Sequence, residues 1–227
     1  WELGRQFFQL PIAVRESVAF PEPGYPYGYC ALSAETLSYS LGEDSPPDLK
    51  ETFAIGPVDP LPDGFSGFTD PDEAAIFAPN LWPAEPVGLR AAWEAYYREM
   101  VALAERLMRL FGIGLGVGEE YFTPFIDRHG SAMRMVHYPH VDGPAEPGQL
   151  RAGPHTDYGT LTILRQDGAP GGLEVRAVDG SWVPVPFVAD SFIINIGDLM
   201  QQWTNDEWRS TLHRVVLPPA GAAGSTE

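Results

Sequence analysis

The stretch AGPHTDYGTLTIL, residues 152–164, places a histidine and an aspartate, His155 and Asp157, directly before an alternating apolar run. Side chains at positions i and i+2 of an extended chain point to the same side, so both could reach one point at the end of a strand. Such a pair is frequent by chance, and it would serve equally well as a polar turn that leads into a strand. A metal site therefore requires a third ligand from elsewhere in the chain.

The remaining four histidines are the candidates for that third ligand. His129 follows Asp-Arg at an expected helix end, where we expect it to be solvated, and His140 lies beside a proline in an expected turn. His137 alternates with its neighbours in a strand-like run, which favours a packing role. His213 lies in STLHRVV, another strand-like run, far enough after Asp157 for the intervening strands to fold back.

Two imidazoles and one carboxylate on one side of a metal leave up to three adjacent coordination positions open. This arrangement suits Fe(II) when the metal must bind a co-substrate and dioxygen together. Zinc accepts the same ligands, but a catalytic zinc site usually has fewer open positions.

The composition is that of a globular protein with a strong negative charge. The 227 residues carry a net charge of −17, which makes nucleic acids and anionic membrane surfaces improbable partners. No apolar run reaches the roughly 18 residues of a membrane span. The single cysteine, Cys30, excludes an intrachain disulfide and a cysteine-rich zinc site, and it fits a cytoplasmic location. The scarcity of lysine beside arginine, with 24 Gly and 23 Pro, suggests GC-rich coding and a bacterial source.

The first part of the chain, residues 1–131, is predicted to be helical and rich in loops. The clearest helix spans residues 87–111, where apolar side chains recur at three- and four-residue steps and define one buried face. These side chains are Leu89, Trp93, Tyr96, Met100, Leu103, Leu107 and Leu110. The run GIGLGVG, residues 112–118, follows a helix rather than a strand, and we expect it to end that helix.

The second part, residues 132–227, has the character of a β-sheet protein. Short strand-like runs are separated by turn residues, and VDGS, residues 178–181, is expected to form a hairpin turn. The runs are AMRMVHYP, TLTILRQD, GLEVRAVDGSWVPVP, SFIINIGDL and STLHRVVLP. Strands without long helices between them predict an antiparallel sandwich or barrel, and the whole chain is most simply one α+β domain that is mainly β.

At this point the chain resembles a known family. HTD at residues 155–157, followed by NIGDLMQQWTNDEWRSTLHRVV at residues 195–216, is similar to the isopenicillin-N-synthase-like branch of the non-haem Fe(II)/2-oxoglutarate oxygenases. The resemblance extends to MRMVHYP at residues 133–139 and, more loosely, to the long helix and to DLKETFAIGP at residues 48–57. It covers nearly the whole chain.

The resemblance implies a double-stranded β-helix (jelly roll) core with flanking helices. It implies that His155, Asp157 and His213 are the iron ligands, with no catalytic residue beyond them. Tyr138 would help to bind the distal carboxylate of 2-oxoglutarate, although Val136 replaces the asparagine of that family element. Fe(II), 2-oxoglutarate and O₂ would together hydroxylate, desaturate or cyclise a small organic molecule, with release of succinate and CO₂.

The chain departs from the family pattern after the distal histidine. The family places Arg-x-Ser on the next strand, where the guanidinium binds the co-substrate carboxylate, and Arg214 cannot replace it because adjacent strand residues point to opposite faces. We expect Arg-x-Ser to lie beyond Glu227 and the family's first strand to lie before Trp1, in a longer protein. The alternatives are an iron oxidase that does not use 2-oxoglutarate, as in isopenicillin N synthase, or a β-helix binding module without catalysis.

Several aromatic residues are also conspicuous. Trp203 and Trp208 are expected to pack in the core or at its rim, whereas the tyrosine-rich GYPYGYC, residues 24–30, is an alternative wall for a substrate pocket. The substrate and the oligomeric state are not predicted.

Overall fold

The computed structural model describes residues 1–42, 44–59, 61, 67–68, 70–140, 145–169 and 171–219. The chain divides into two compact units. Unit 1 consists of Trp1–Cys30 and Thr52–Met135, and unit 2 consists of Ala31–Glu51 and Val136–Glu227. The predicted division into residues 1–131 and 132–227 within one domain stays a prediction. Residues 31–51 belong to the same compact unit as the C-terminal strands.

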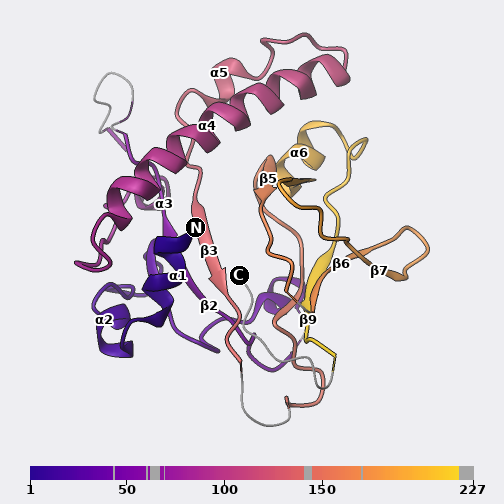
Figure 1. The fold of residues 1–227 in the computed structure, drawn as a ribbon. Coiled ribbons are helices and arrows are strands. Elements are labelled where there is room, and N and C mark those ends of the chain that lie inside the picture. The colour runs from indigo at the N-terminus through magenta and orange to yellow at the C-terminus, as the bar shows by residue number, and fades with distance from the viewer. Residues whose placement is uncertain are drawn as a thin grey trace. The chain divides into compact units, whose positions relative to one another are not determined.

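Helices dominate unit 1 (Figure 1). They are α1 (Glu2–Gln9), α2 (Ile12–Glu16), α3 (Pro71–Ile76), α4 (Leu89–Gly114) and α5 (Thr123–Ile126). The long helix predicted over residues 87–111 is α4, and GIGLGVG does end it. Gly116 and Gly118 have φ angles of 71° and 103°, and the N–H groups of Val117 and Gly118 both donate to the carbonyl of Gly112. None of the described helices has the length and apolar character needed to cross a membrane.

The buried face of α4 differs from the predicted one. Tyr96 and Leu110 are 40% and 60% exposed, whereas Tyr97 is only 4% exposed. The first turns of α4 bury residues at four-residue intervals, so Tyr97 follows Leu89 and Trp93 on the same face. The hydroxyl of Tyr97 then donates to the carbonyl of Ser131 at 2.7 Å, which satisfies its polar end.

Aromatic side chains fill the core of unit 1. Strands β1 (Gly28–Cys30), β2 (Glu51–Ile55) and β3 (Met133–His137) form a sheet in the order β1-β2-β3. Phe7 and Phe53 are fully buried with ring centroids 4.7 Å apart, and Trp93 lies 5.1 Å from Phe53 on another side.

Two tyrosines of the tyrosine-rich loop belong to this core. Tyr27 and Tyr29 are each 2% exposed. The hydroxyls of Tyr25 and Tyr27 donate to the backbone carbonyls of Pro79 and Ile76. These contacts use the polar atoms of the loop to hold neighbouring chain segments, and the alternative of a pocket wall stays a prediction.

Unit 2 contains the strands of a double-stranded β-helix. The strands are β4 (Ala152–His155), β5 (Leu161–Leu164), β6 (Gly172–Arg176), β7 (Trp182–Pro184), β8 (Ile193–Ile196) and β9 (His213–Val216). They form one sheet in the order β4-β9-β6-β7 and a second sheet of β5 and β8, all with antiparallel pairing. The chain therefore crosses from the first sheet to the second at β5 and again at β8, and returns each time, as in a jelly roll. The predicted fold class is confirmed.

Two short helical elements accompany these strands. Helix α6 (Asp198–Trp203) follows β8, and a 3-10 helix, η1 (Leu37–Leu41), contacts β4. The predicted hairpin joins β6 to β7, where Gly180 has a φ of 85° and Ala177 N–H donates to the carbonyl of Ser181. This left-handed conformation explains the glycine in VDGS.

Candidate metal centre

The strand pairing of unit 2 brings together the three predicted ligands. Strands β4 and β9 are antiparallel neighbours, and His155 lies directly opposite His213 in their register. Asp157 follows β4 by two residues. The Oδ1 atom of Asp157 is 4.0 Å from Nε2 of His155 and 3.7 Å from Nε2 of His213. Among the described residues these form the group of possible metal ligands, with all three ligand atoms within 4.8 Å of one another.

Backbone carbonyls orient both imidazoles toward the same point. Nδ1 of His155 is 2.7 Å from the carbonyl oxygen of Gly153, and Nδ1 of His213 is 3.0 Å from that of Thr211. A carbonyl only accepts hydrogen bonds, so each Nδ1 carries the proton. In the neutral ring Nε2 then has its lone pair available, which is the tautomer that ligates metals.

The carboxylate of Asp157 is held by one oxygen and presents the other. Oδ2 accepts hydrogen bonds from the hydroxyl of Thr162 at 2.6 Å and from the amide of Asn195 at 2.8 Å. Thr162 and Asn195 are direct partners in the β5–β8 pairing, so both donors come from one position in the second sheet. Oδ1 remains directed at the two imidazoles.

These contacts also affect protonation. Burial raises the pKa of Asp157, but hydrogen bonds from Asn195 and Thr162, together with the nearby His213 and His155, outweigh burial, and the net pKa lies below its usual value. Burial, followed by the proximity of His213, lowers the pKa of His155. An ionised carboxylate and a neutral imidazole are the forms that bind a metal.

The turn before α6 fixes the backbone around Asp157. The N–H group of Asp198 donates to the carbonyl of Asp157 at 2.7 Å, and the hydroxyl of Thr156 donates to the Asp198 carboxylate at 3.1 Å. A Cβ atom at Gly197 would overlap the carbonyl oxygen of Gly159. Glycine is therefore required here by close approach of two backbone segments.

Thr162 and Asn195 were not predicted as site residues. The available signal was a single polar residue within each of two apolar strands, LTIL (β5) and IINI (β8). A polar side chain buried in a sheet needs a partner, and here that partner is the Asp157 carboxylate.

The other predicted residues lie elsewhere. His137 has its Nδ1 2.7 Å from Oε1 of the buried Glu51, so it makes a polar contact rather than the predicted packing contact. The prediction that His129 is solvated is wrong, because this residue is half-buried. Its ring is stacked with that of Tyr97 at a centroid distance of 6.4 Å, and burial lowers its pKa. His140 is exposed.

Tyr138 and Arg214 have defined neighbours. The guanidinium of Arg151 lies 5.6 Å from the centre of the Tyr138 ring. Burial, followed by the charge of Asp48, raises the pKa of Tyr138, so its hydroxyl remains a hydrogen-bond donor at neutral pH. Arg214 pairs with Glu174 at 2.7 Å and lies over Trp182 at 4.1 Å, which occupies its guanidinium, as expected for a side chain opposite to His213. The predicted Arg-x-Ser element falls outside the described residues.

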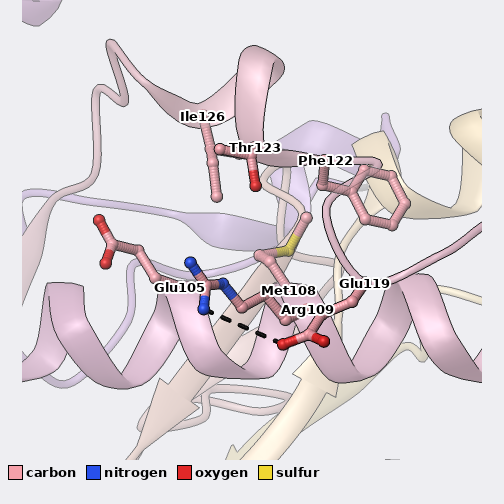
Figure 2. Close-up of a pocket in the computed structure, with 7 residues that line it drawn as sticks. All are labelled: Glu105, Met108, Arg109, Glu119, Phe122, Thr123 and Ile126. Atoms are coloured by element: carbon pink, nitrogen blue, oxygen red, sulfur yellow. Dashed lines mark ion pairs between the residues drawn. The ribbon is translucent and has the colours of Figure 1, made fainter.

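Trp203 and a pocket between α4 and α5 are two further features that do not include the candidate ligands. Trp203 is 41% exposed at the end of α6, which agrees with rim packing rather than core packing. Figure 2 shows a pocket between α4 and α5, in which apolar groups such as Met108 lie beside Arg109. Arg109 forms ion pairs with Glu119 and Glu120 at its edge. None of the three candidate ligands lines this pocket.

Comparison with known proteins agrees with this site. Residues 129–223 match the family model of the 2OG-Fe(II) oxygenase superfamily. A validamycin A dioxygenase from Streptomyces hygroscopicus subsp. limoneus is 36% identical over 96% of this chain and 59% of its own length. A proline hydroxylase from Petromyces alliaceus is 35% identical over 96% of this chain and 65% of its own length.

Solved structures give the same result. A full-length Neurospora crassa protein in complex with alpha-KG and thymine has a TM-score of 0.81 and 32% identity, covering 99% of this chain and 68% of that one. A putative 2OG-Fe(II) oxygenase family protein from Caulobacter crescentus has a TM-score of 0.77 and 31% identity, covering 99% of this chain and 69% of that one.

The chain therefore belongs to the 2OG-Fe(II) oxygenase superfamily. It spans about three fifths of the length of the curated relatives it matches, with 59%, 64% and 65% covered in three of them. These relatives come from both bacterial and fungal sources, so the bacterial origin stays a prediction.

Proposed function

We propose that this chain is the metal-binding part of an Fe(II)/2-oxoglutarate-dependent oxygenase that oxidises a small organic molecule. The observation that carries the proposal is the convergence of two imidazole Nε2 atoms and one carboxylate oxygen within 4.8 Å of one another. Both imidazoles are anchored through Nδ1 and the carboxylate through Oδ2. Two histidines and one carboxylate are the ligand set of non-haem Fe(II) oxygenases.

The residues of the site fit Fe(II) and define what the protein contributes. Bound Fe(II) would supply the oxidising chemistry with O₂ and the decarboxylation of 2-oxoglutarate. His155 and His213 would offer neutral nitrogen ligands without a proton to displace, and Asp157 would offer an ionised oxygen. The paired strands β4 and β9 hold the two nitrogen ligands in a fixed relation. Little conformational entropy is therefore lost when the metal binds.

Tyr138 is our candidate for binding the distal carboxylate of 2-oxoglutarate. Burial raises the pKa of its hydroxyl further above neutral pH, and the protonated hydroxyl can donate to a carboxylate. Arg151 is buried, and its guanidinium places a positive charge 5.6 Å from the centre of the Tyr138 ring. This assignment is a proposal for Tyr138 alone and does not replace the Arg-x-Ser element expected beyond Glu227.

We infer a small organic molecule as the substrate because relatives are named for validamycin A and proline, and a related structure contains thymine. The net charge of −17 favours a neutral or cationic molecule over an anionic one and argues against nucleic-acid partners. A cytoplasmic location is inferred from the single cysteine, Cys30, which is buried.

Turnover of 2-oxoglutarate tests the proposal. The purified protein is mixed anaerobically with Fe(II) and 2-oxoglutarate, exposed to O₂, and succinate is measured by mass spectrometry. We expect slow succinate release without substrate, and at least a tenfold loss in His213→Ala because one nitrogen ligand is removed. Arg165→Ala, on the segment after β5, is the control and should retain succinate release. Equal release by wild type and His213→Ala would contradict the proposal.

The alternative of an iron oxidase that does not use 2-oxoglutarate predicts another result. Such a protein would bind Fe(II) through the same three ligands but release no succinate. A binding module without catalysis would not bind Fe(II) at all under anaerobic conditions, and His213→Ala would then change nothing.

A further inference from the structure

A bulge at the start of the metal site leaves Gly153 outside the β4–β9 ladder. Ala152 pairs with Val215 and His155 pairs with His213, so β4 has two residues where β9 has only Arg214. A bulge frees backbone groups from their usual partners. The N–H of Gly153 donates instead to Oδ1 of Asp48 at 2.8 Å, and its carbonyl accepts from Nδ1 of His155 at 2.7 Å. Gly153 thus links Asp48 to a metal ligand.

Asp48 is buried, and both its carboxylate and its backbone N–H form hydrogen bonds. It is 2% exposed, and its Oδ2 accepts hydrogen bonds from the N–H of Leu37 at 3.1 Å and from Nζ of Lys50 at 2.8 Å. Its own N–H donates to the carbonyl of Glu35 at 2.9 Å. Lys50 is 4% exposed and also lies 3.4 Å from Oε2 of Glu35. A buried carboxylate with this many partners is a rigid attachment point.

The packing around Gly153 leaves no room for a side chain at this position. A Cβ atom at this position would overlap Oγ of Ser38 and would lie 3.3 Å from Oδ1 of Asp48. Only glycine brings the bulged backbone this close to the carboxylate. The second imidazole differs, because His213 is oriented by the carbonyl of Thr211, which precedes β9.

We propose that Asp48 is a positioning residue that fixes the tautomer and direction of His155 through Gly153, with Lys50 holding Asp48 in place. This inference deepens the proposed function and rests on it, since it concerns how one ligand is presented to the metal. Asp48 and Lys50 lie more than 100 positions before His155, and no ligand pattern includes them. The structure assigns them to the support of one imidazole and not of the other.

The test compares the two histidines in metal-free protein. Long-range ¹H–¹⁵N NMR spectra of the wild type should show Nδ1–H tautomers for both His155 and His213. In Asp48→Ala we expect the His155 signals to move toward mixed tautomers, while His213 keeps its Nδ1–H form. Co(II) affinity, measured by absorbance titration, should fall roughly tenfold, the lower end of the effect of losing an outer-sphere partner.

Glu174→Ala is the matched control. It removes a partly buried carboxylate from an ion pair with Arg214 in the same sheet, without touching Gly153 or Thr211. We expect it to leave both tautomers and the Co(II) affinity unchanged. If Asp48→Ala does not fold, Asp48→Asn replaces it. The amide has one acceptor oxygen for three donors, so a smaller shift at His155 alone is expected.

For either Asp48 variant, a change at His155 that spares His213 supports the proposal. A change at both histidines, or at neither, overturns it. The tautomer measurement needs no metal, so it is independent of the proposed function. Failure of the wild type to bind Co(II) would instead count against the metal site itself.

Discussion

The two oxygens of the Asp157 carboxylate have separate tasks. Oδ2 is bound by Thr162 and Asn195, and Oδ1 faces His155 and His213. A carboxylate with one oxygen fixed cannot rotate to bind a metal through both oxygens without losing these two hydrogen bonds. The donors on β5 and β8 therefore favour binding through one oxygen, which leaves more positions of the metal open.

This division of tasks predicts the effect of removing one donor. Thr162→Val keeps the shape of the side chain but removes the hydroxyl that donates to Asp157 at 2.6 Å. We expect Co(II) affinity to fall about tenfold in absorbance titrations, because the carboxylate loses an outer-sphere partner and its pKa rises.

Thr162→Ser is the matched control, since it retains the hydroxyl, and it should bind Co(II) within about twofold of the wild type. If Thr162→Val binds as tightly as the wild type, or if both variants lose affinity equally, the hydroxyl does not support the ligand.

At this scale the sequence allowed the candidate ligands to be predicted, and they stay a prediction, but it did not indicate their supports. His155 and Asp157 lie two positions apart in the chain, and His213 belongs to a recognisable motif. Asn195 and Asp48 act only through the pairing of β5 with β8 and through the bulge in β4, which are properties of the folded chain. Residue types alone do not indicate which buried polar groups will meet.

Among the elements, the turn between β8 and α6 matters most for the site. The N–H groups of Asp198 and Leu199 donate to carbonyls in residues 157–159, so the chain that carries Asp157 is tied to the start of α6. Gly197 and Gly159 lie close together at this turn, and they differ in the space available for a Cβ atom. A Cβ at Gly197 would overlap the Gly159 carbonyl, whereas a Cβ at Gly159 would meet nothing within 4 Å.

Alanine substitutions of these two glycines should therefore have different costs. We expect Gly197→Ala to lower the free energy of unfolding by about 1–3 kcal/mol, since overpacking forces the backbones apart. It should also weaken Co(II) binding, because Asp157 is displaced. Gly159→Ala should change stability by less than about 1 kcal/mol. Urea unfolding followed by circular dichroism measures the free energy of unfolding of both variants. Equal losses in the two variants would contradict the close backbone contact at Gly197.

The elements themselves were largely predictable, with an informative exception. The long helix, the hairpin at Gly180 and the strand character of residues 160–164 all follow from local patterns. The buried face of α4 does not, because a choice between Tyr96 and Tyr97 depends on where Phe53 and Ser131 lie. Periodicity indicates that a face exists, and tertiary packing decides which residues belong to it.

On the scale of the whole molecule, the metal site draws on segments that are far apart in the chain yet belong to one compact unit. Residues 48–50 support His155, and residues 195–199 support Asp157. All of them are in unit 2 with the three ligands. The sequence predicted a front half and a back half, and it could not reveal that a short segment before β2 serves the C-terminal strands.

Hydrogen exchange should show this grouping directly. We expect Co(II) binding to slow amide exchange in residues 48–50, 152–164 and 195–213, because ordering the ligands also orders the segments bonded to them. Residues 89–126 of α4 and α5 should show little change. Mass spectrometry of peptides with and without Co(II) measures this, with His213→Ala as the control. Slowing concentrated in residues 89–126 would contradict it.

The direct pairing of His155 with His213 also bears on how such a chain can diverge. Because the two histidines face each other across β4 and β9, their separation depends on one strand register and not on the length of chain between them. The β6–β7 hairpin, whose tip residue Val178 is 96% exposed, can lengthen or shorten without moving either imidazole. A lineage can thus change the length of this hairpin while it inherits the same spacing of the two imidazoles.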